Sequence, residues 1–162
     1  MGGVPIDSTS TYPAAPAAVL ALLTDEQFLR DRAAALGAQV HEVTVAGTRT
    51  TTRLAAPTEG IPPVFARFVG SSVSVVEQSD WTSDGAGGHR TDLDVQAEVF
   101  GRTVQVTGER RLVPDGTGTR STVTGDATVD APLIGRQAEG AVRELVTVVL
   151  RREDELLRRR LG

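Results

Sequence analysis

The stretch LIGRQAEGAVRELVTVVLRREDELLRRRL, residues 133–161, predicts one long helix after a series of strands, and this helix decides the fold. Its apolar residues recur at three- and four-residue steps, the spacing of a helix that buries one face. These residues are Ile134, Ala138, Val142, Leu145, Val149 and Leu156. A polar gap at Arg152 and Glu153 interrupts the series. Pro132 suits a helix start, and a helix of roughly 28 residues would be about 42 Å long.

The sequence before this helix, from residue 39 to residue 130, predicts antiparallel strands. Residues 91–99 show the clearest alternation, with Leu93, Val95, Ala97 and Val99 on one face and charged or polar residues on the other. Further strands are expected at 40–45, 48–56, 72–81, 102–113 and 119–129. Turn signals separate them: Ala46-Gly47, the glycine-rich segment 83–88, Gly101, and Pro114-Asp115-Gly116. The segment 64–68 is compatible with a short helix or a bulged strand.

The first part of the chain predicts one strand and two short helices. Residues 4–12 alternate like a strand, and prolines 13 and 16 end the pattern. Residues 17–23 and 26–36 then suit two helices, with Thr24 or Asp25 as the N-cap of the second and Gly37 as its stop. We expect residues 30–32 to lie mostly on the outer face of that helix.

This order of elements predicts an α+β fold. A strongly curved antiparallel sheet of about seven strands would wrap around the long C-terminal helix, with two short helices after the first strand. A curved sheet cannot pack flush against a single helix over its whole width. We therefore expect a cavity between the sheet and the helix.

Composition excludes several classes of site. The chain has 162 residues, which predicts a single domain over residues 1–162, and its 40% hydrophobic and 23% charged residues are typical of a globular protein. It has no Cys, no Lys and only two His, so cysteine-ligated metals, Schiff-base chemistry and a three-histidine zinc site are excluded. We expect no metal and no cofactor.

Charge and hydropathy limit the kinds of binding partner and the cellular location that we expect. The net charge of −4 argues against nucleic acid as a partner. The longest apolar run, residues 14–23, is about half of a membrane span, so we expect no stable membrane insertion. The first basic residue is Arg30, so the sequence lacks the charged start of a signal peptide, and we expect a cytoplasmic protein.

Two stretches resemble a known superfamily. STYPAAPAAVLALLTD, residues 10–25, is similar to a first strand, a proline-containing turn and a Val-x-x-Leu-x-x-Asp helix, and VDAPLIGRQAE, residues 129–139, is similar to the start of the last helix. Both resemble the START-like superfamily (SRPBCC, or helix-grip), which includes polyketide cyclases and lipid-transfer domains. Within it, the chain looks like a bacterial family, common in actinobacteria, that is named only as a domain of unknown function. The resemblance covers nearly the whole chain and implies the helix-grip fold, but no catalytic residue.

Strand parity and helix periodicity suggest which side chains would face the cavity. The apolar candidates are Val95, Ala97, Val104, Val106, Val123, Val142, Leu145 and Val149. Arg110 shares the parity of Val104 and Val106, so it could anchor a ligand carboxylate or phosphate, or it could form an internal ion pair with a carboxylate such as Glu77.

The other candidates each have an ordinary structural explanation as well. His41 shares the parity of Val43 and could be a general base or a structural hydrogen-bonding group. The remaining candidates are Tyr12 and Trp81 as an aromatic lining or core, Phe65 and Phe68 as a gate or simple packing, and Glu139 as a ligand contact or a favourable charge in the first turns of the helix.

Three hypotheses of function follow. We favour a binding module, with no catalytic residue, that holds a hydrophobic small molecule or lipid between the sheet and the helix. The second is a polyketide cyclase or dehydratase-like enzyme, in which His41, Glu77 or Arg110 moves protons or stabilises an enolate. The third is an interaction protein with a filled core. We expect a monomer or a homodimer.

Overall fold

The computed structural model describes residues 3–57, 72–99, 102–130 and 135–162. The described residues form one antiparallel sheet and three helices. The strands are β1 (Val4–Tyr12), β2 (Gln39–Ala46), β3 (Arg49–Pro57), β4 (Ser72–Asp80), β5 (Thr82–Ser83), β6 (His89–Val99), β7 (Arg102–Asp115) and β8 (Gly118–Val129). The helices are α1 (Pro16–Leu23), α2 (Glu26–Ala35) and α4 (Gly135–Leu161).

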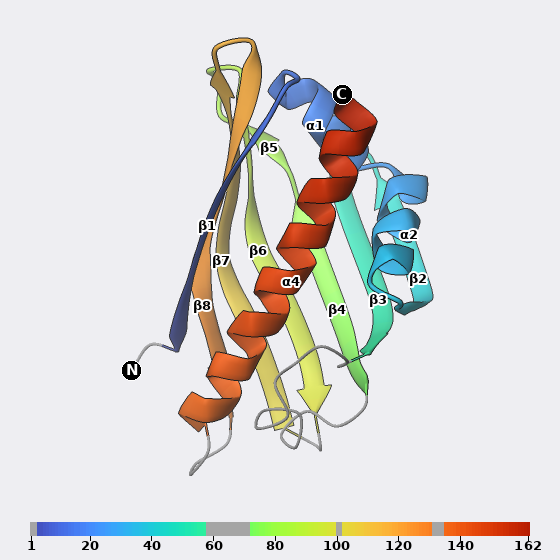
Figure 1. The fold of residues 1–162 in the computed structure, drawn as a ribbon, viewed down its shortest axis with the longest axis vertical. Coiled ribbons are helices and arrows are strands. Elements are labelled where there is room, and N and C mark those ends of the chain that lie inside the picture. The colour runs from blue at the N-terminus through green and yellow to red at the C-terminus, as the bar shows by residue number, and fades with distance from the viewer. Residues whose placement is uncertain (1–2, 58–71, 100–101, 131–134) are drawn as a thin grey trace.

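The sheet has the strand order β1-β8-β7-β6-β4-β3-β2, with the short β5 paired to β6. α4 runs diagonally across one face of this curved sheet, and α1 lies beside its C-terminal end (Figure 1). The predicted α+β fold, with a sheet of about seven strands around a long C-terminal helix, is confirmed. Most sheet neighbours are consecutive in the chain, so hairpins build almost the whole sheet.

Local signals place the two short helices and the first hairpin. Pro16 occupies the first turn of α1, and the Asp25 side chain caps α2 by accepting a hydrogen bond of 2.9 Å from the backbone N–H of Phe28. Gly37 follows α2 with φ +69°, as the predicted stop requires. The β2–β3 turn lies one residue later than predicted, at Gly47-Thr48, because Ala46 still pairs with Arg49.

Two hydrophobic clusters pack between the sheet and the helices. The upper cluster includes Leu156 and Leu157 from the C-terminal end of α4, which is uppermost in Figure 1. Its other buried members are Tyr12, Val19, Leu23, Phe28, Leu29, Val43, Trp81 and Leu112. The lower cluster includes Val142 from the N-terminal half of α4, together with Ile6, Val73, Val104, Val106, Val123 and Ala127. Large side chains fill the upper cluster, whereas the lower cluster consists mainly of valine.

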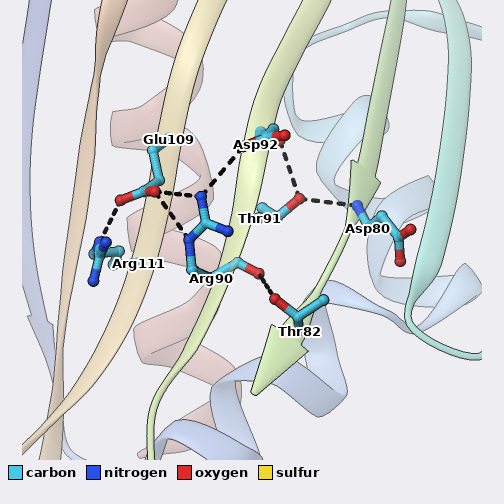
Figure 2. Close-up of polar contacts among 7 residues, drawn as sticks. All are labelled: Asp80, Thr82, Arg90, Thr91, Asp92, Glu109 and Arg111. Carbon is cyan, nitrogen blue, oxygen red and sulfur yellow. Dashed lines mark hydrogen bonds and ion pairs between the residues drawn. The ribbon is translucent and has the colours of Figure 1, made fainter. Parts of the chain in front are cut away.

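The opposite face of the sheet is polar. Arg90 on β6 donates a hydrogen bond of 2.9 Å from Nε to Glu109 on β7, and Arg111 also donates to Glu109 (Figure 2). Exposed ion pairs of this kind contribute little to stability. The next residue of β6, Thr91, is instead buried and points to the inner face, where its hydroxyl accepts a hydrogen bond of 2.9 Å from the backbone N–H of Asp80 (Figure 2).

Candidate functional site

A cavity of about 160 Å³ lies between the sheet and α4. Side chains from α2, α4 and five strands line it. They are Arg32, Leu36, Thr52, Leu54, Ala56, Pro57, Val73, Val75, Glu77, Leu93, Val95, Ala97, Val104, Val106, Arg110, Val123, Val142, Leu145, Val146, Val149, Leu150 and Glu153. Aliphatic side chains form most of this wall, and the few polar ones are contiguous.

The aliphatic wall follows from strand alternation. On neighbouring strands, Val75 pairs with Ala97 and Ala97 with Val104, so these side chains form a row across the inner face. Successive residues of a strand point to opposite faces, which sends the intervening polar residues to the other face. α4 closes the cavity on the other side. Its lining residues there are Val142, Leu145, Val146, Val149 and Leu150. Small β-branched side chains leave space here that large ones would fill.

Four charged side chains form a linked network at one end of the cavity. Arg32 on α2 donates from Nη1 to Glu153 Oε2 at 2.8 Å and from Nη2 to Glu77 Oε1 at 2.9 Å. Arg110 on β7 donates from Nη2 to the other oxygen of Glu153. Arg32, Arg110 and Glu153 keep only 6%, 8% and 1% of their surface exposed. One α4 carboxylate thus joins α2 to strand β7.

The network is electrically balanced and strongly coupled. Burial alone would raise the pKa of Glu153, but the charges of Arg110 and Arg32 and their hydrogen bonds lower it to about 2. Burial likewise opposes the charged form of Arg32, but the charges of Glu77 and Glu153 raise its pKa above the ordinary value. Glu153 and Arg32 are therefore charged at neutral pH, and the formal charges of the two arginines and two glutamates sum to zero.

The network separates the cavity from the upper cluster. Along α4, Glu153 lies between the cavity-lining Val149 and Leu150 and the upper-cluster residues Leu156 and Leu157. A buried ion network gives little net stability over apolar side chains of the same volume, because removing charges from water costs several kcal/mol per ion.

Among the described residues, two buried polar side-chain atoms in or next to the network have no hydrogen-bond partner. They are Thr52 Oγ1 and Arg110 Nε. Thr52 on β3 pairs directly with Glu77 on β4, so it adjoins the network. Buried polar groups without partners are rare in folded proteins, and each costs about 1–3 kcal/mol. Both residues line the cavity.

The residues expected from the sequence fall into four groups. Those that line the cavity are Glu77, Val95, Ala97, Val104, Val106, Arg110, Val123, Val142, Leu145 and Val149. Tyr12 and Trp81 instead belong to the upper cluster, beyond the network. Tyr12 also donates a hydrogen bond to Asp154 on α4, which ties β1 to the helix. Phe65 and Phe68 lie outside the described residues.

His41 and Glu139 do not line the cavity. A register shift between Val40 and Glu42 interrupts the pairing of β2 with β3, and His41, at the bulge, is exposed. The bulge breaks the shared parity with Val43 that placed His41 inside. Glu139 accepts a hydrogen bond of 3.1 Å from the backbone N–H of Val129, so it joins α4 to β8. The ion pair considered between Arg110 and Glu77 is also replaced, since Arg110 pairs with Glu153 and Glu77 with Arg32.

Sequence reasoning missed Arg32, Thr52 and Glu153. The sequence predicts Arg32 on the outer face of α2, yet it follows the buried Phe28 by four residues and is itself buried. Glu153 likewise follows Val149 by four residues, within the apolar stripe of α4. In both cases a charged residue occupies a position of the helix's apolar stripe. This pattern could have identified Arg32 and Glu153, although in the sequence it looks like a gap in the stripe.

Neither a metal centre nor a membrane span is found in the described part of the chain. No group of three or more His, Asp or Glu there could hold a metal ion. No described helix is long and apolar enough to cross a membrane.

Comparison with known families assigns the chain to one of them. Residues 7–161 match a family described as "Protein of unknown function (DUF2505)". The chain belongs to this family. A search of curated proteins finds no match.

Solved structures show the same fold. A protein from Thermus thermophilus is 21% identical with a TM-score of 0.61, over 94% of this chain and 96% of that one. A STAR-related lipid transfer protein fragment from Xanthomonas axonopodis is 20% identical with a TM-score of 0.61, over 94% of this chain and 84% of that one. A START superfamily protein from Mycobacterium smegmatis is 17% identical with a TM-score of 0.56, over 98% of this chain and 97% of that one. The family member described here therefore has a START-like fold.

Proposed function

We propose that the protein binds a hydrophobic small molecule in the cavity between the sheet and α4. The observation that carries this proposal is a cavity of about 160 Å³ whose wall is aliphatic except for one polar end. Ligand sites are typically concave and mostly apolar, with a few placed polar groups. The structural relative named as a lipid transfer protein has the same fold, which supports the proposal.

The volume sets the scale of the ligand. An apolar protein cavity of about 150 Å³ is known to accept benzene. Burying six ring carbons at about 0.8 kcal/mol each gains roughly 5 kcal/mol, which corresponds to a dissociation constant between about 0.1 and 1 mM. Each further buried methylene would tighten binding about fourfold. A ring-sized apolar group is therefore the smallest ligand that the cavity would hold measurably.

Displacement of a fluorescent hydrophobic probe from the purified protein tests the proposal. A panel of ring-sized and longer apolar molecules should displace the probe, and native mass spectrometry followed by denaturing extraction should recover any molecule retained from the expression host. No binding by any member of a broad panel would count against a ligand cavity.

A pair of variants on β6 locates the binding. Ala97→Phe would place a ring in the cavity, because Ala97 lines it, whereas Gln96→Phe would place the same ring on the opposite face of the sheet. We expect Ala97→Phe to abolish displacement and Gln96→Phe to leave it unchanged. Circular dichroism of both variants checks that they fold. Equal binding by the two folded variants would place the ligand elsewhere.

A further inference from the structure

We infer that the ligand carries a neutral hydrogen-bond donor, such as a hydroxyl group, and that this group donates to the carboxylate of Glu77 in the cavity wall. The inference rests on the proposed function, because it concerns the same cavity. It adds the chemical class of the ligand's polar group, the side chain that would receive it and the direction in which the ligand lies.

The first argument is accessibility. Five of the described residues that line the cavity have polar side chains, namely Arg32, Thr52, Glu77, Arg110 and Glu153. The side chains of Arg32, Arg110 and Glu153 are at most 10% exposed, and Thr52 is 1% exposed. The side chain of Glu77 is 27% exposed. Glu77 is therefore the polar group of this described wall that a ligand can reach.

The second argument is hydrogen bonding. Oε1 of Glu77 accepts a hydrogen bond of 2.9 Å from Nη2 of Arg32, and no other described residue donates to this carboxylate. Its Oε2 can therefore accept a hydrogen bond from a ligand. A carboxylate that is paired with an arginine accepts hydrogen bonds and donates none. A ligand group that binds here must carry a donor, which a hydroxyl has and an ether, a ketone or a hydrocarbon lacks.

The third argument is charge. Arg32 pairs with Glu77 and Glu153, and Arg110 pairs with Glu153. A ligand carboxylate would bring a further negative charge next to Glu77 and would find both arginines already paired. A ligand ammonium would lie close to Arg32 and would lose its water in a largely apolar space. A neutral donor avoids both costs. It replaces the ligand carboxylate or phosphate that the sequence suggested for Arg110.

The fourth argument is direction. Towards the start of β4, the lining residues that precede Glu77 are Val75 and Val73, and Val95 pairs with Glu77 on the neighbouring strand. In the other direction, Trp81 belongs to the filled upper cluster. A donor on Glu77 therefore places the rest of the ligand over the aliphatic residues. The four residues from Glu77 to Val73 span about 13 Å at about 3.3 Å per residue, so a ring with a short para substituent fits along the strand.

Three ligands that differ in one small group test the class. The hydroxyl of para-ethylphenol donates and accepts, the methoxy group of para-ethylanisole only accepts, and the methyl group of para-ethyltoluene does neither. Titration calorimetry at pH 7 should give a dissociation constant for para-ethylphenol about tenfold lower than for para-ethyltoluene, because hydrogen bonds to charged groups are the stronger kind. We expect para-ethylanisole to bind no tighter than para-ethyltoluene. The anion para-ethylbenzoate should bind at least about tenfold more weakly than para-ethylphenol.

Two glutamates provide the matched variants. Glu77→Gln can keep the oxygen that accepts from Arg32, and it replaces the other oxygen by an amide nitrogen, which donates. It should reduce the preference for para-ethylphenol over para-ethyltoluene severalfold and make para-ethylanisole bind tighter than para-ethyltoluene. Glu109→Gln makes the same change on the opposite face of the sheet, at a side chain that is also 27% exposed and paired with arginines, and it should leave both preferences unchanged. Thermal unfolding checks that each variant folds.

The possible outcomes separate the two proposals. If para-ethyltoluene or para-ethylanisole binds the wild type as tightly as para-ethylphenol, or if para-ethylbenzoate binds most tightly, the donor inference is wrong and the cavity remains a hydrophobic site. The inference is also wrong if folded Glu77→Gln keeps the wild-type preferences, or if other apolar molecules displace the probe but para-ethylphenol does not bind. The wild-type series decides the question even if Glu77→Gln does not fold. If neither these ligands nor any molecule of the broad panel binds, the proposed function itself fails.

Discussion

Glu153 receives hydrogen bonds from two buried arginines, and this makes it the residue at which the charge network is most easily broken. Glu153→Gln keeps the size of the side chain but leaves Arg32 and Arg110 without a negative partner on α4. Breaking a buried ion pair from one side costs about 3–5 kcal/mol. We expect a loss of about 3 kcal/mol in the free energy of unfolding, measured by urea denaturation. Glu144→Gln, an exposed position on the same helix, should change it by less than about 0.5 kcal/mol.

The same carboxylate gives the protein an acid-sensitive stability. The pKa of Glu153 is lowered to about 2 in the folded protein, whereas an unfolded glutamate has a pKa of about 4.3. A lowered folded pKa contributes stability above the unfolded pKa, and this contribution is lost as the pH falls through the folded value. The difference corresponds to about 3 kcal/mol, lost between about pH 5 and pH 2.

Comparison of the wild type with Glu153→Gln isolates this contribution from the other carboxylates. The stability difference between them, measured by urea denaturation at several pH values, should be largest above about pH 5 and shrink towards zero near about pH 2. A difference that stays constant over this range would show that the ionised carboxylate of Glu153 is not what stabilises the fold.

At the scale of elements, the contact between β7 and β8 depends on glycine. Gly108 and Gly125 are cross-strand partners, and a Cβ on Gly125 would lie 2.2 Å from the backbone oxygen of Thr107. Gly140 in α4 has open space instead, with nothing within 4 Å of an added Cβ. The same substitution, glycine to alanine, should therefore have opposite effects in the sheet and in the helix.

Gly125→Ala should destabilise the protein by about 2 kcal/mol or more, because strand backbone must move to relieve the contact. Gly140→Ala should stabilise it by up to about 1 kcal/mol, because alanine is the better helix former. Thermal unfolding of both variants measures the two effects. A stable Gly125→Ala protein would mean that β7 and β8 separate easily at this point.

Element boundaries and inner faces were largely predictable from the sequence, and the exceptions have definite causes. Alternation in β6 and β7 placed Val95, Ala97 and Val104 correctly on the inner face. It failed at His41, because a single bulged residue in β2 reverses parity, and residue types do not reveal a bulge. Parity also does not show how far along a strand the cavity extends. Trp81 has the inward parity of β4, but it lies beyond the network, in the upper cluster.

The polar end of the site was harder to predict because its residues come from distant parts of the chain. Arg32, Glu77 and Glu153 meet only when α2, β4 and α4 are brought together. Each of the three has an ordinary surface interpretation in its own segment. Periodicity shows which face of an element a residue occupies, but it cannot show that an opposite charge lies on the facing element.

At the scale of the whole molecule, the network divides the interior into two parts of different packing. Above it, the buried residues include Phe28, Trp81 and Leu157. Below it, mainly valines and leucines surround the cavity, and several lining residues, such as Val146 and Leu150, are only partly buried. Fold class was predictable because it depends on the order of elements. Ligand identity was not, because it depends on the few atoms at the boundary between these two parts.

This division predicts that the two ends of α4 differ in local stability. Amides near Leu156 and Leu157 are anchored by a filled core, whereas those from Val142 to Val149 pack over the cavity and have fewer close contacts to lose on opening. Hydrogen exchange followed by mass spectrometry should show slower exchange in the C-terminal half of α4 than in its N-terminal half. A saturating cavity ligand should slow the N-terminal half and reduce the difference, since a molecule present at about 100 times its dissociation constant adds about 2.7 kcal/mol to the stability of the bound state. Equal protection along α4 without ligand would contradict the division, and a ligand that left the N-terminal half unchanged would not occupy this cavity.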